Sequence, residues 1–159
     1  MPYMSLPSTQ TSGDLAKVLY SIEGDPTDGS LPATILVVDD NAMARIYAVI
    51  VVEGAGYSAL IAEDADDALD VLTTHPRISA LFTDVDMPGR MDGLELAAEA
   101  RRLRPDLGIL IASGKREPYE DALPERAVFV SKPYEVPVVA LALAALLAEA
   151  AQFQGGLER

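Results

Sequence analysis

Five polar residues follow short apolar runs at places where phosphoryl chemistry would need them. The acid pair Asp39-Asp40 ends one run, and Asp84, Ser113 and Lys132 each end a later one. Grouped carboxylates bind a divalent cation, and a carboxylate can attack phosphorus. An ammonium and a hydroxyl can hold phosphoryl oxygens. The residue types therefore predict a site for phosphoryl transfer.

The apolar runs themselves predict buried parallel strands. They are short, rich in β-branched residues and followed by helix-like sequence, at residues 35–38, 78–82, 107–111 and 127–130. Residues 57–62 predict one further strand. Because the carboxyl ends of parallel strands meet at one rim of an open sheet, the five polar residues should converge there.

Helices are expected after each strand, which gives a doubly wound five-stranded α/β sheet with helices on both faces. Asn41 should cap the first, with Met43, Ile46, Tyr47, Ile50 and Val51 on one face. The next covers residues 65–73. Asp92 and Glu95 form a capping box for another, and the last runs from about 135 to 152.

The two ends of the chain differ from its middle. Residues 1–33 are rich in Pro, Ser, Thr, Gly and Asp and predict an extension, with residues 34–153 as the domain and 154–159 as a tail. Within the extension, Leu15, Val18, Leu19 and Ile22 recur at helical spacing. Residues 14–22 are therefore either a short helix that docks through its apolar face or part of a flexible tail.

Composition limits the classes of partner. The formal net charge of −13 opposes binding to nucleic acid or anionic lipid, which requires clustered cations. The chain has no cysteine, which excludes disulfides and thiolate metal sites. No secretory signal is visible, and the longest apolar stretch, residues 136–148, is too short to span a bilayer. A cytoplasmic protein is expected.

Several strings together resemble the receiver domain of bacterial two-component response regulators, over roughly residues 34–150. They are Ile-Leu-Val-Val-Asp39-Asp40-Asn41, Leu-Phe-Thr-Asp84-Val-Asp86-Met-Pro88, Asp92-Gly93, Ser113-Gly114 and Lys132-Pro133. The resemblance implies a flavodoxin-like sheet in the order 2-1-3-4-5.

The resemblance also implies roles. Asp84 would accept a phosphoryl group, and Ser113 and Lys132 would hold its oxygens. Mg²⁺ or Mn²⁺ would be held by Asp40, Asp84 and the backbone carbonyl of Asp86, with Asp39 orienting metal-bound water. Ser113 and Phe129 would form the switch that reports phosphorylation. The bond between Lys132 and Pro133 is expected to be cis.

Two departures from the family pattern affect how a signal would leave the site. The pair Gly89-Arg90 lengthens the loop after Asp84 by one residue. The segment 114–126 is short and contains Pro118 and Pro124, so the fourth helix is expected to be shortened to a turn or two, or displaced.

The last helix has two apolar faces. Val136, Val139, Leu143, Leu146 and Leu147 should pack on the sheet, and the opposite face carries Val138, Leu141, Ala142, Ala145 and Ala148. A contiguous apolar strip predicts a covering partner. That partner is a downstream protein, a second copy of the chain or the segment 15–22.

The function expected is that of a single-domain response regulator, because only about nine residues follow Ala150. A histidine kinase or a histidine phosphotransfer protein would donate the phosphoryl group, and output would be altered protein binding or a phosphate sink. Such a protein is no enzyme beyond its own phosphorylation and dephosphorylation. The alternatives are an unphosphorylated receiver-like interaction domain and, ranked lower, a haloacid-dehalogenase-type phosphatase, whose D-x-D motif Asp84 and Asp86 resemble.

Overall fold

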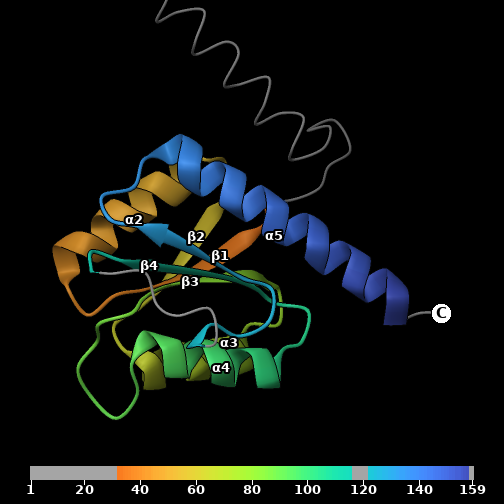
Figure 1. Ribbon diagram of the computed structural model, residues 1–159, viewed down its shortest axis with the longest axis horizontal. Helices are drawn as coiled ribbons and strands as arrows, with labels where there is room; N and C mark the ends of the chain where they lie inside the picture. The colour runs from red at the N-terminus through yellow and green to blue at the C-terminus, as the bar shows by residue number, and fades with distance from the viewer. Residues whose placement is uncertain (1–31, 116–121, 158–159) are drawn as a thin grey trace, which may run out of the picture. The chain divides into compact units, whose positions relative to one another are not determined.

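A computed structural model describes residues 32–115 and 122–157 of the chain. One parallel sheet contains five strands in the order β2-β1-β3-β4-β5 (Figure 1). The strands are β1 (Thr34–Val38), β2 (Ser58–Ala62), β3 (Ile78–Asp84), β4 (Gly108–Ser113) and β5 (Ala127–Ser131). The predicted fold class and strand order are therefore confirmed. The predicted extension 1–33 and its helix 14–22 lie, except for residues 32 and 33, outside the described residues.

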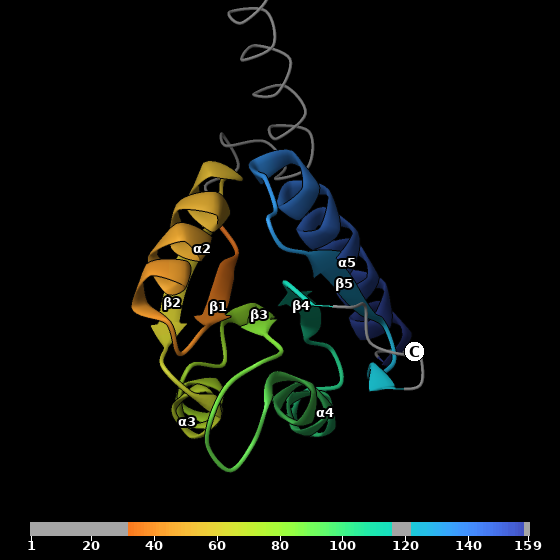
Figure 2. The same ribbon diagram turned by 60° about the vertical axis from the view of Figure 1, so that its left-hand side comes forward.

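Helices cover both faces of the sheet. They are α2 (Ala42–Gly54), α3 (Ala65–Thr74), α4 (Gly93–Leu103) and α5 (Val136–Leu157). Figure 2 shows α2 and α5 on one face and α3 and α4 on the other. Because helices bury both faces, the central strands are apolar at nearly every position, as the continuous runs in the sequence indicated.

Alternation along each strand divides the core between the two helical layers. Leu36 and Val38 of β1 belong to the cluster that α3 and α4 cover, together with Leu96. Ile35 and Val37 are equally buried and point to the other face, because successive strand side chains alternate. The same alternation decides which residues at the strand ends face α2 and α5 and which face α3 and α4.

Side-chain caps set where three helices begin. The Asn41 side chain accepts a hydrogen bond from the Ala44 amide at 2.9 Å. Asp64 does the same for the Asp67 amide at 2.8 Å. Asp92 and Glu95 form the predicted capping box at α4. Each cap satisfies amides that the first helical turn leaves unpaired, so the chain turns into a helix soon after its strand.

The face of α2 that packs on the sheet is not the one that the apolar spacing marked. Ala48, Val51 and Val52 are buried, whereas the other four marked residues are exposed: Met43, Ile46, Tyr47 and Ile50. The helix carries apolar residues of its own on several sides, so their spacing alone could not show which side faces the sheet. An exposed apolar surface on α2 results.

Helix α5 has the inner and outer faces that were predicted, but it is longer. Val139, Leu143 and Leu146 are buried, and Val138 and Leu141 are exposed. The helix continues past the expected end at residue 152 to Leu157. The Gly155-Gly156 pair, which favours a helix end by intrinsic propensity, lies inside it. Residues 154–157 therefore belong to α5 and not to a tail.

Helix α5 is also long and apolar enough to cross a membrane, over the window Val136–Phe153. The sequence estimate counted only the uncharged stretch that ends before Glu149. A helix that packs one face on a sheet passes the same test of length and composition, and α5 contacts β3, β4 and β5 through its buried face. The apolar composition is thus explained in part by core packing.

The connection from β4 to β5 has no α-helix in residues 114–115 and 122–126. The short or displaced helix that was expected between these two strands, which is not the helix labelled α4, otherwise falls on residues 116–121, outside the described part. Every other crossover between neighbouring strands in the chain contains one of the helices α2, α3 and α4.

Candidate functional site

Five side chains predicted to converge lie at the carboxyl ends of adjacent strands. Asp39 and Asp40 follow β1, Asp84 ends β3, Ser113 ends β4 and Lys132 follows β5. The Lys132 ammonium is 3.0 Å from a carboxylate oxygen of Asp84 and 3.4 Å from one of Asp39. Strand pairing places these ends together, since β1 pairs with β3, β3 with β4 and β4 with β5.

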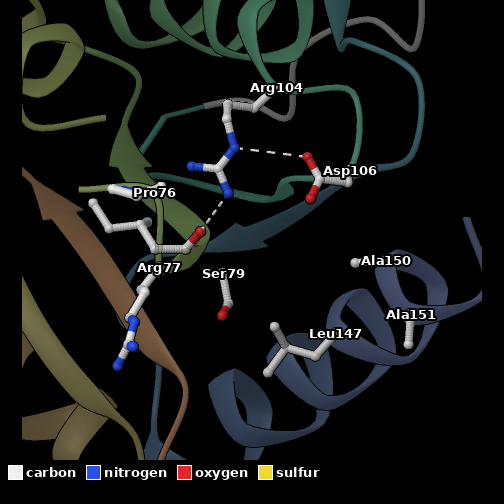
Figure 3. Close-up of a pocket in the computed structure, with 9 residues that line it drawn as sticks. Pro76, Arg77, Ser79, Arg104, Asp106, Leu147, Ala150 and Ala151 are labelled. Atoms are coloured by element: carbon white, nitrogen blue, oxygen red, sulfur yellow. Dashed lines mark hydrogen bonds and ion pairs between the residues drawn. The ribbon is translucent and has the colours of Figure 1, made fainter. Parts of the chain in front are cut away.

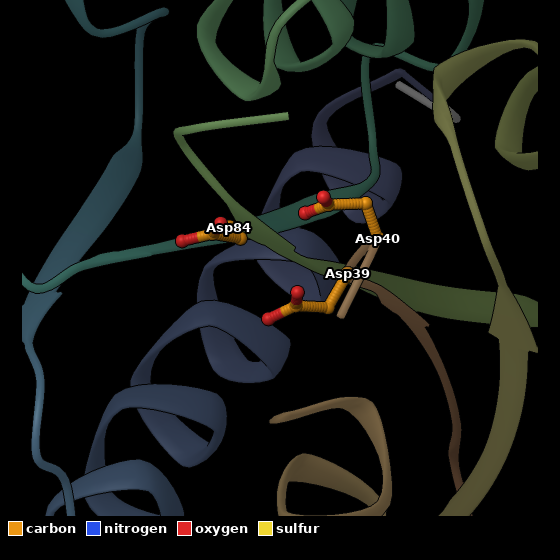
Figure 4. Close-up of side chains that lie close together, drawn as sticks. All are labelled: Asp39, Asp40 and Asp84. Atoms are coloured by element: carbon orange, nitrogen blue, oxygen red, sulfur yellow. The ribbon is translucent and has the colours of Figure 1, made fainter. Parts of the chain in front are cut away.

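Three carboxylates form an acidic cluster at this rim, shown in Figure 4. One oxygen from each of Asp39, Asp40 and Asp84 lies within 4.8 Å of the others. Asp39 is buried at 4% exposure, whereas Asp40 is exposed. Like charges at about 4 Å cost on the order of 4 kcal/mol each at an effective dielectric of ~20. This cost and the all-oxygen donor set fit a hard divalent cation such as Mg²⁺.

Burial and the neighbouring ammonium act in opposite directions on Asp84. Burial raises the pKa of the Asp84 carboxyl, the hydrogen bond and charge of Lys132 lower it, and the charges of Asp39 and Asp86 raise it, so the pKa lies above its ordinary value. Burial lowers the pKa of Lys132, but the Asp84 and Asp39 carboxylates outweigh this, so the pKa of Lys132 lies above its ordinary value. Within the described residues, Lys132 is the one ammonium paired with these three carboxylates, which leaves excess negative charge.

Arg45 supports the acidic turn and was missed by the sequence reasoning. Its guanidinium donates a hydrogen bond of 2.7 Å to the backbone carbonyl of Asp39 and lies 3.6 Å from Glu63. The Asn41 amide donates to the Asp39 carboxylate at 2.9 Å. The available signal was that Arg45 is the only cation in α2, one helical turn after the cap. These bonds fix the turn that presents both acids.

Ser113 and Asp86 both lie near Lys115. Ser113 is 2% exposed, and its hydroxyl oxygen accepts a hydrogen bond from the Lys115 amide at 3.1 Å. The Lys115 ammonium is 3.5 Å from the Asp86 carboxylate. The Asp86 side chain therefore interacts with Lys115, and it is not in the three-carboxylate group. Only its backbone carbonyl stays a candidate for the cation.

Phe129, predicted as a switch residue, is half-buried on β5. It packs with Leu123 against the core that α3 and α4 cover. The predicted cis peptide bond joins Lys132 and Pro133.

The loop that follows Asp84 closes tightly on the strand end. The Gly93 amide donates to the Val85 carbonyl at 2.8 Å. A Cβ atom at position 93 would lie 1.7 Å from the Asp84 carbonyl oxygen, so only glycine fits. In the lengthened part of the loop, Gly89 has φ of +112°, and Arg90 forms an exposed ion pair with Asp66 at 2.8 Å. Arg90 therefore contacts α3 and does not reach the acidic cluster.

A hollow of about 220 Å³ lies near the amino-terminal end of β3, at the end of the sheet opposite the acidic cluster (Figure 3). Arg104 lines it, but this guanidinium donates to the Ile78 carbonyl at 2.7 Å and lies 3.6 Å from Asp106. The hollow contains one acid and no group of carboxylates among its lining residues. The carboxyl rim therefore remains the candidate site.

Comparison with known proteins agrees with this geometry. The family model for the response regulator receiver domain matches residues 35–144. Response regulator receiver protein CpdR of Brucella abortus is 38% identical over 106 residues, which cover 64% of this chain and 85% of CpdR. Response regulator MprA of Mycobacterium sp. strain KMS is 31% identical over 133 residues, covering 79% of this chain. That match spans only 55% of MprA.

A solved structure also resembles the fold. The CheY-like response regulator receiver domain protein from Methanospirillum hungatei JF-1 superposes with a TM-score of 0.66 at 25% identity. The match covers 77% of this chain and 98% of that chain. Strand order, acidic rim and sequence similarity therefore agree with one another.

Proposed function

The chain belongs to the response regulator receiver domain family, and we propose that Asp84 accepts a phosphoryl group from a histidine kinase or a histidine phosphotransfer protein. The observation that carries this proposal is the Asp84 carboxylate, held 3.0 Å from the Lys132 ammonium beside two further acids. Family membership supports a signalling domain of two-component systems.

In the proposed reaction, a carboxylate oxygen of Asp84 attacks phosphorus. The bond from phosphorus to the donor breaks, and its electron pair leaves with the donor, which is the imidazole of a phosphohistidine. An acyl phosphate on Asp84 results. Lys132 and the Ser113 hydroxyl, both at the same rim, would hold phosphoryl oxygens, because such transfer depends on position and on neutralising oxygen charge.

A divalent cation, Mg²⁺ or Mn²⁺, would complete the site. Asp40, Asp84 and the backbone carbonyl of Asp86 would bind it, and Asp39 would orient its water. When bound, the cation supplies charge neutralisation for the incoming phosphoryl oxygens. The excess of carboxylates over ammonium groups at the rim supports this proposal.

Output would occur through other proteins or through drainage of phosphate as a sink. We propose a single-domain regulator. The match to CpdR supports this, because it spans 85% of that relative, whereas the match to MprA spans 55% and leaves a large part of MprA outside it. Ser113 and Phe129 would form the switch. The exposed side of α5, with Val138 and Leu141, would bind a downstream protein or a second copy. The cytoplasmic location stays a prediction.

One experiment separates this proposal from its alternatives. The protein is incubated with Mg²⁺ and acetyl phosphate, and intact mass is measured for the wild type, for Asp84→Asn and for Asp70→Asn, which alters an exposed acid of α3. The proposal expects an adduct of one phosphoryl group in the wild type and Asp70→Asn, and none in Asp84→Asn.

The alternatives have different outcomes. Steady consumption of donor without an adduct would support the phosphatase. No reaction, with a phosphorylated histidine kinase as a second donor also giving none, would support the unphosphorylated interaction domain. Use of both donors is necessary because small phosphodonors are poor substrates for some receivers.

A further inference from the structure

Tyr47 links helix α2 to the loop that carries Lys132. Its hydroxyl donates a hydrogen bond of 2.6 Å to the backbone carbonyl of Tyr134, although 87 residues separate the two in sequence. Tyr134 is two residues beyond Lys132, in the connection from β5 to α5. The bond therefore ties an outer helix to the backbone that positions the ammonium.

An aromatic stack strengthens the same link. The Tyr134 ring is 5% exposed and lies 5.5 Å from the Tyr47 ring and 5.3 Å from the Phe82 ring, between centroids. Phe82 is two residues before Asp84 on β3. Tilted aromatic pairs at such distances stabilise one another beyond simple burial. Helix α2, strand β3 and the loop after β5 therefore meet at Tyr134, close in sequence to both Asp84 and Lys132.

The ammonium depends on this backbone for its position. A lysine side chain is long and flexible, so its charged group lies where needed only if the backbone and its surroundings restrict it. The Lys132 amide is fixed by a bond of 2.9 Å to the Ser113 carbonyl. β5 ends at Ser131, and beyond Lys132 the Tyr134 carbonyl is held by another element through its bond to Tyr47.

An open space borders this loop on one side. A hollow of about 340 Å³ lies beside it, lined by Ala44, Tyr47, Lys132, Pro133 and Tyr134. The hydrogen bond from Tyr47 joins α2 to the loop at the border of this space.

We infer that Tyr47 is a positioning residue for Lys132: its hydroxyl holds the Tyr134 carbonyl and thereby places the ammonium beside Asp84. This inference rests on the proposed phosphoryl transfer to Asp84. Tyr47 would thus affect the reaction through Lys132, without a direct contact to the acids or to the phosphoryl group.

The substitution Tyr47→Phe tests the inference because it removes the hydroxyl and keeps the ring. Adduct formation on Asp84 is measured at saturating Mg²⁺ over a range of donor concentrations. We expect the maximal rate to fall about tenfold, the effect of one lost hydrogen bond in a positioned site. Mg²⁺ affinity should not fall, because the carboxylates are untouched and a loosened Lys132 ammonium would repel the cation less. Ile50→Ala, which shortens another exposed apolar side chain of α2, is the matched control and should keep the wild-type rate.

A double substitution separates positioning from a general structural effect. If Tyr47 acts through Lys132, adding Tyr47→Phe to Lys132→Ala should leave the rate of Lys132→Ala unchanged. The nitrogen NMR signal of the Lys132 ammonium gives a second readout, which should broaden in Tyr47→Phe and not in Ile50→Ala.

Specific results would overturn the inference. A wild-type rate in Tyr47→Phe would do so, as would an equal fall in rate with and without Lys132, or an unchanged ammonium signal. Absence of any adduct on wild-type Asp84, with either donor, would instead refute the proposed function and the inference together.

Discussion

The Lys132 ammonium lies between two carboxylates, 3.0 Å from Asp84 and 3.4 Å from Asp39. These three residues come from the ends of β1, β3 and β5, so the contact depends on the pairing of β1 with β3, β3 with β4 and β4 with β5. In the proposed reaction the same ammonium would pass from the Asp84 carboxylate to a phosphoryl oxygen on it.

Replacement of Lys132 should separate phosphoryl transfer from metal binding. We expect Lys132→Ala to slow adduct formation by about 10- to 100-fold, because a hydrogen bond to a charged group contributes about 1.5–3 kcal/mol. Mg²⁺ affinity should rise, since a competing positive charge leaves the acids. Arg77→Ala, which removes an exposed cation at the other edge of the sheet, should change neither quantity. Weaker Mg²⁺ binding in Lys132→Ala would contradict the expected repulsion.

Mg²⁺ should stabilise the folded protein through the acidic cluster. At a concentration about 100-fold above its dissociation constant, a ligand specific to the folded state adds about 2.7 kcal/mol to the free energy of unfolding. Thermal unfolding with and without Mg²⁺ should show this gain in the wild type and in Asp70→Asn. Asp40→Asn should show much less. A full gain in Asp40→Asn would remove Asp40 from the ligand set.

Without metal, the charged form of Asp84 should destabilise the fold. Burial raises the pKa of the Asp84 carboxyl above its ordinary value of 3.8, so the folded state holds the proton more tightly than the unfolded state does. The resulting stability is present below that ordinary value and is lost as pH rises through the folded pKa. Asp84→Asn, which carries no such charge, should therefore gain stability relative to the wild type over this window.

Urea unfolding in EDTA at a series of pH values measures this difference. The advantage of Asp84→Asn should be small near pH 4, grow with pH and then level off. Asp70→Asn, which keeps Asp84, is the matched control. An advantage that shrinks as pH rises would show that the attraction of Lys132 outweighs burial.

Gly93 should be intolerant of any side chain. A Cβ there would lie 1.7 Å from the Asp84 carbonyl oxygen and 2.9 Å from the Val85 Cα, both backbone atoms that cannot rotate away. We expect Gly93→Ala to lower the free energy of unfolding by about 3 kcal/mol or more. Gly114→Ala, whose Cβ would lie 3.8 Å from the Lys132 Cβ in ordinary van der Waals contact, is the control and should change stability little. Equal stability of the two variants would contradict the close approach.

The strands, the helix caps and the acidic rim were predictable because their signals are local in the sequence. Strand order followed from the family resemblance, and the capping residues Asn41 and Asp92 are recognisable from type and spacing. Val38 precedes Asp39 at a buried strand end, which puts the acids at the rim in any parallel sheet of this kind.

Other features depend on contacts that no local pattern contains. The inner face of α2 could not be chosen because apolar residues occur on several sides of it, and packing selected Ala48, Val51 and Val52. The bond of Arg45 to the Asp39 carbonyl, and that of Tyr47 to the Tyr134 carbonyl, join residues through backbone oxygens, whose positions exist only in the folded chain.

The most direct test of the central claim is the position of the phosphoryl group. The protein is phosphorylated by a small donor or by a histidine kinase, the acyl phosphate is reduced with borohydride, which converts the modified aspartate to homoserine, and peptides are sequenced by mass spectrometry. We expect homoserine at position 84 and unmodified Asp39 and Asp40. Homoserine at position 39 or 40 with none at 84, or an adduct that persists in Asp84→Asn, would contradict it.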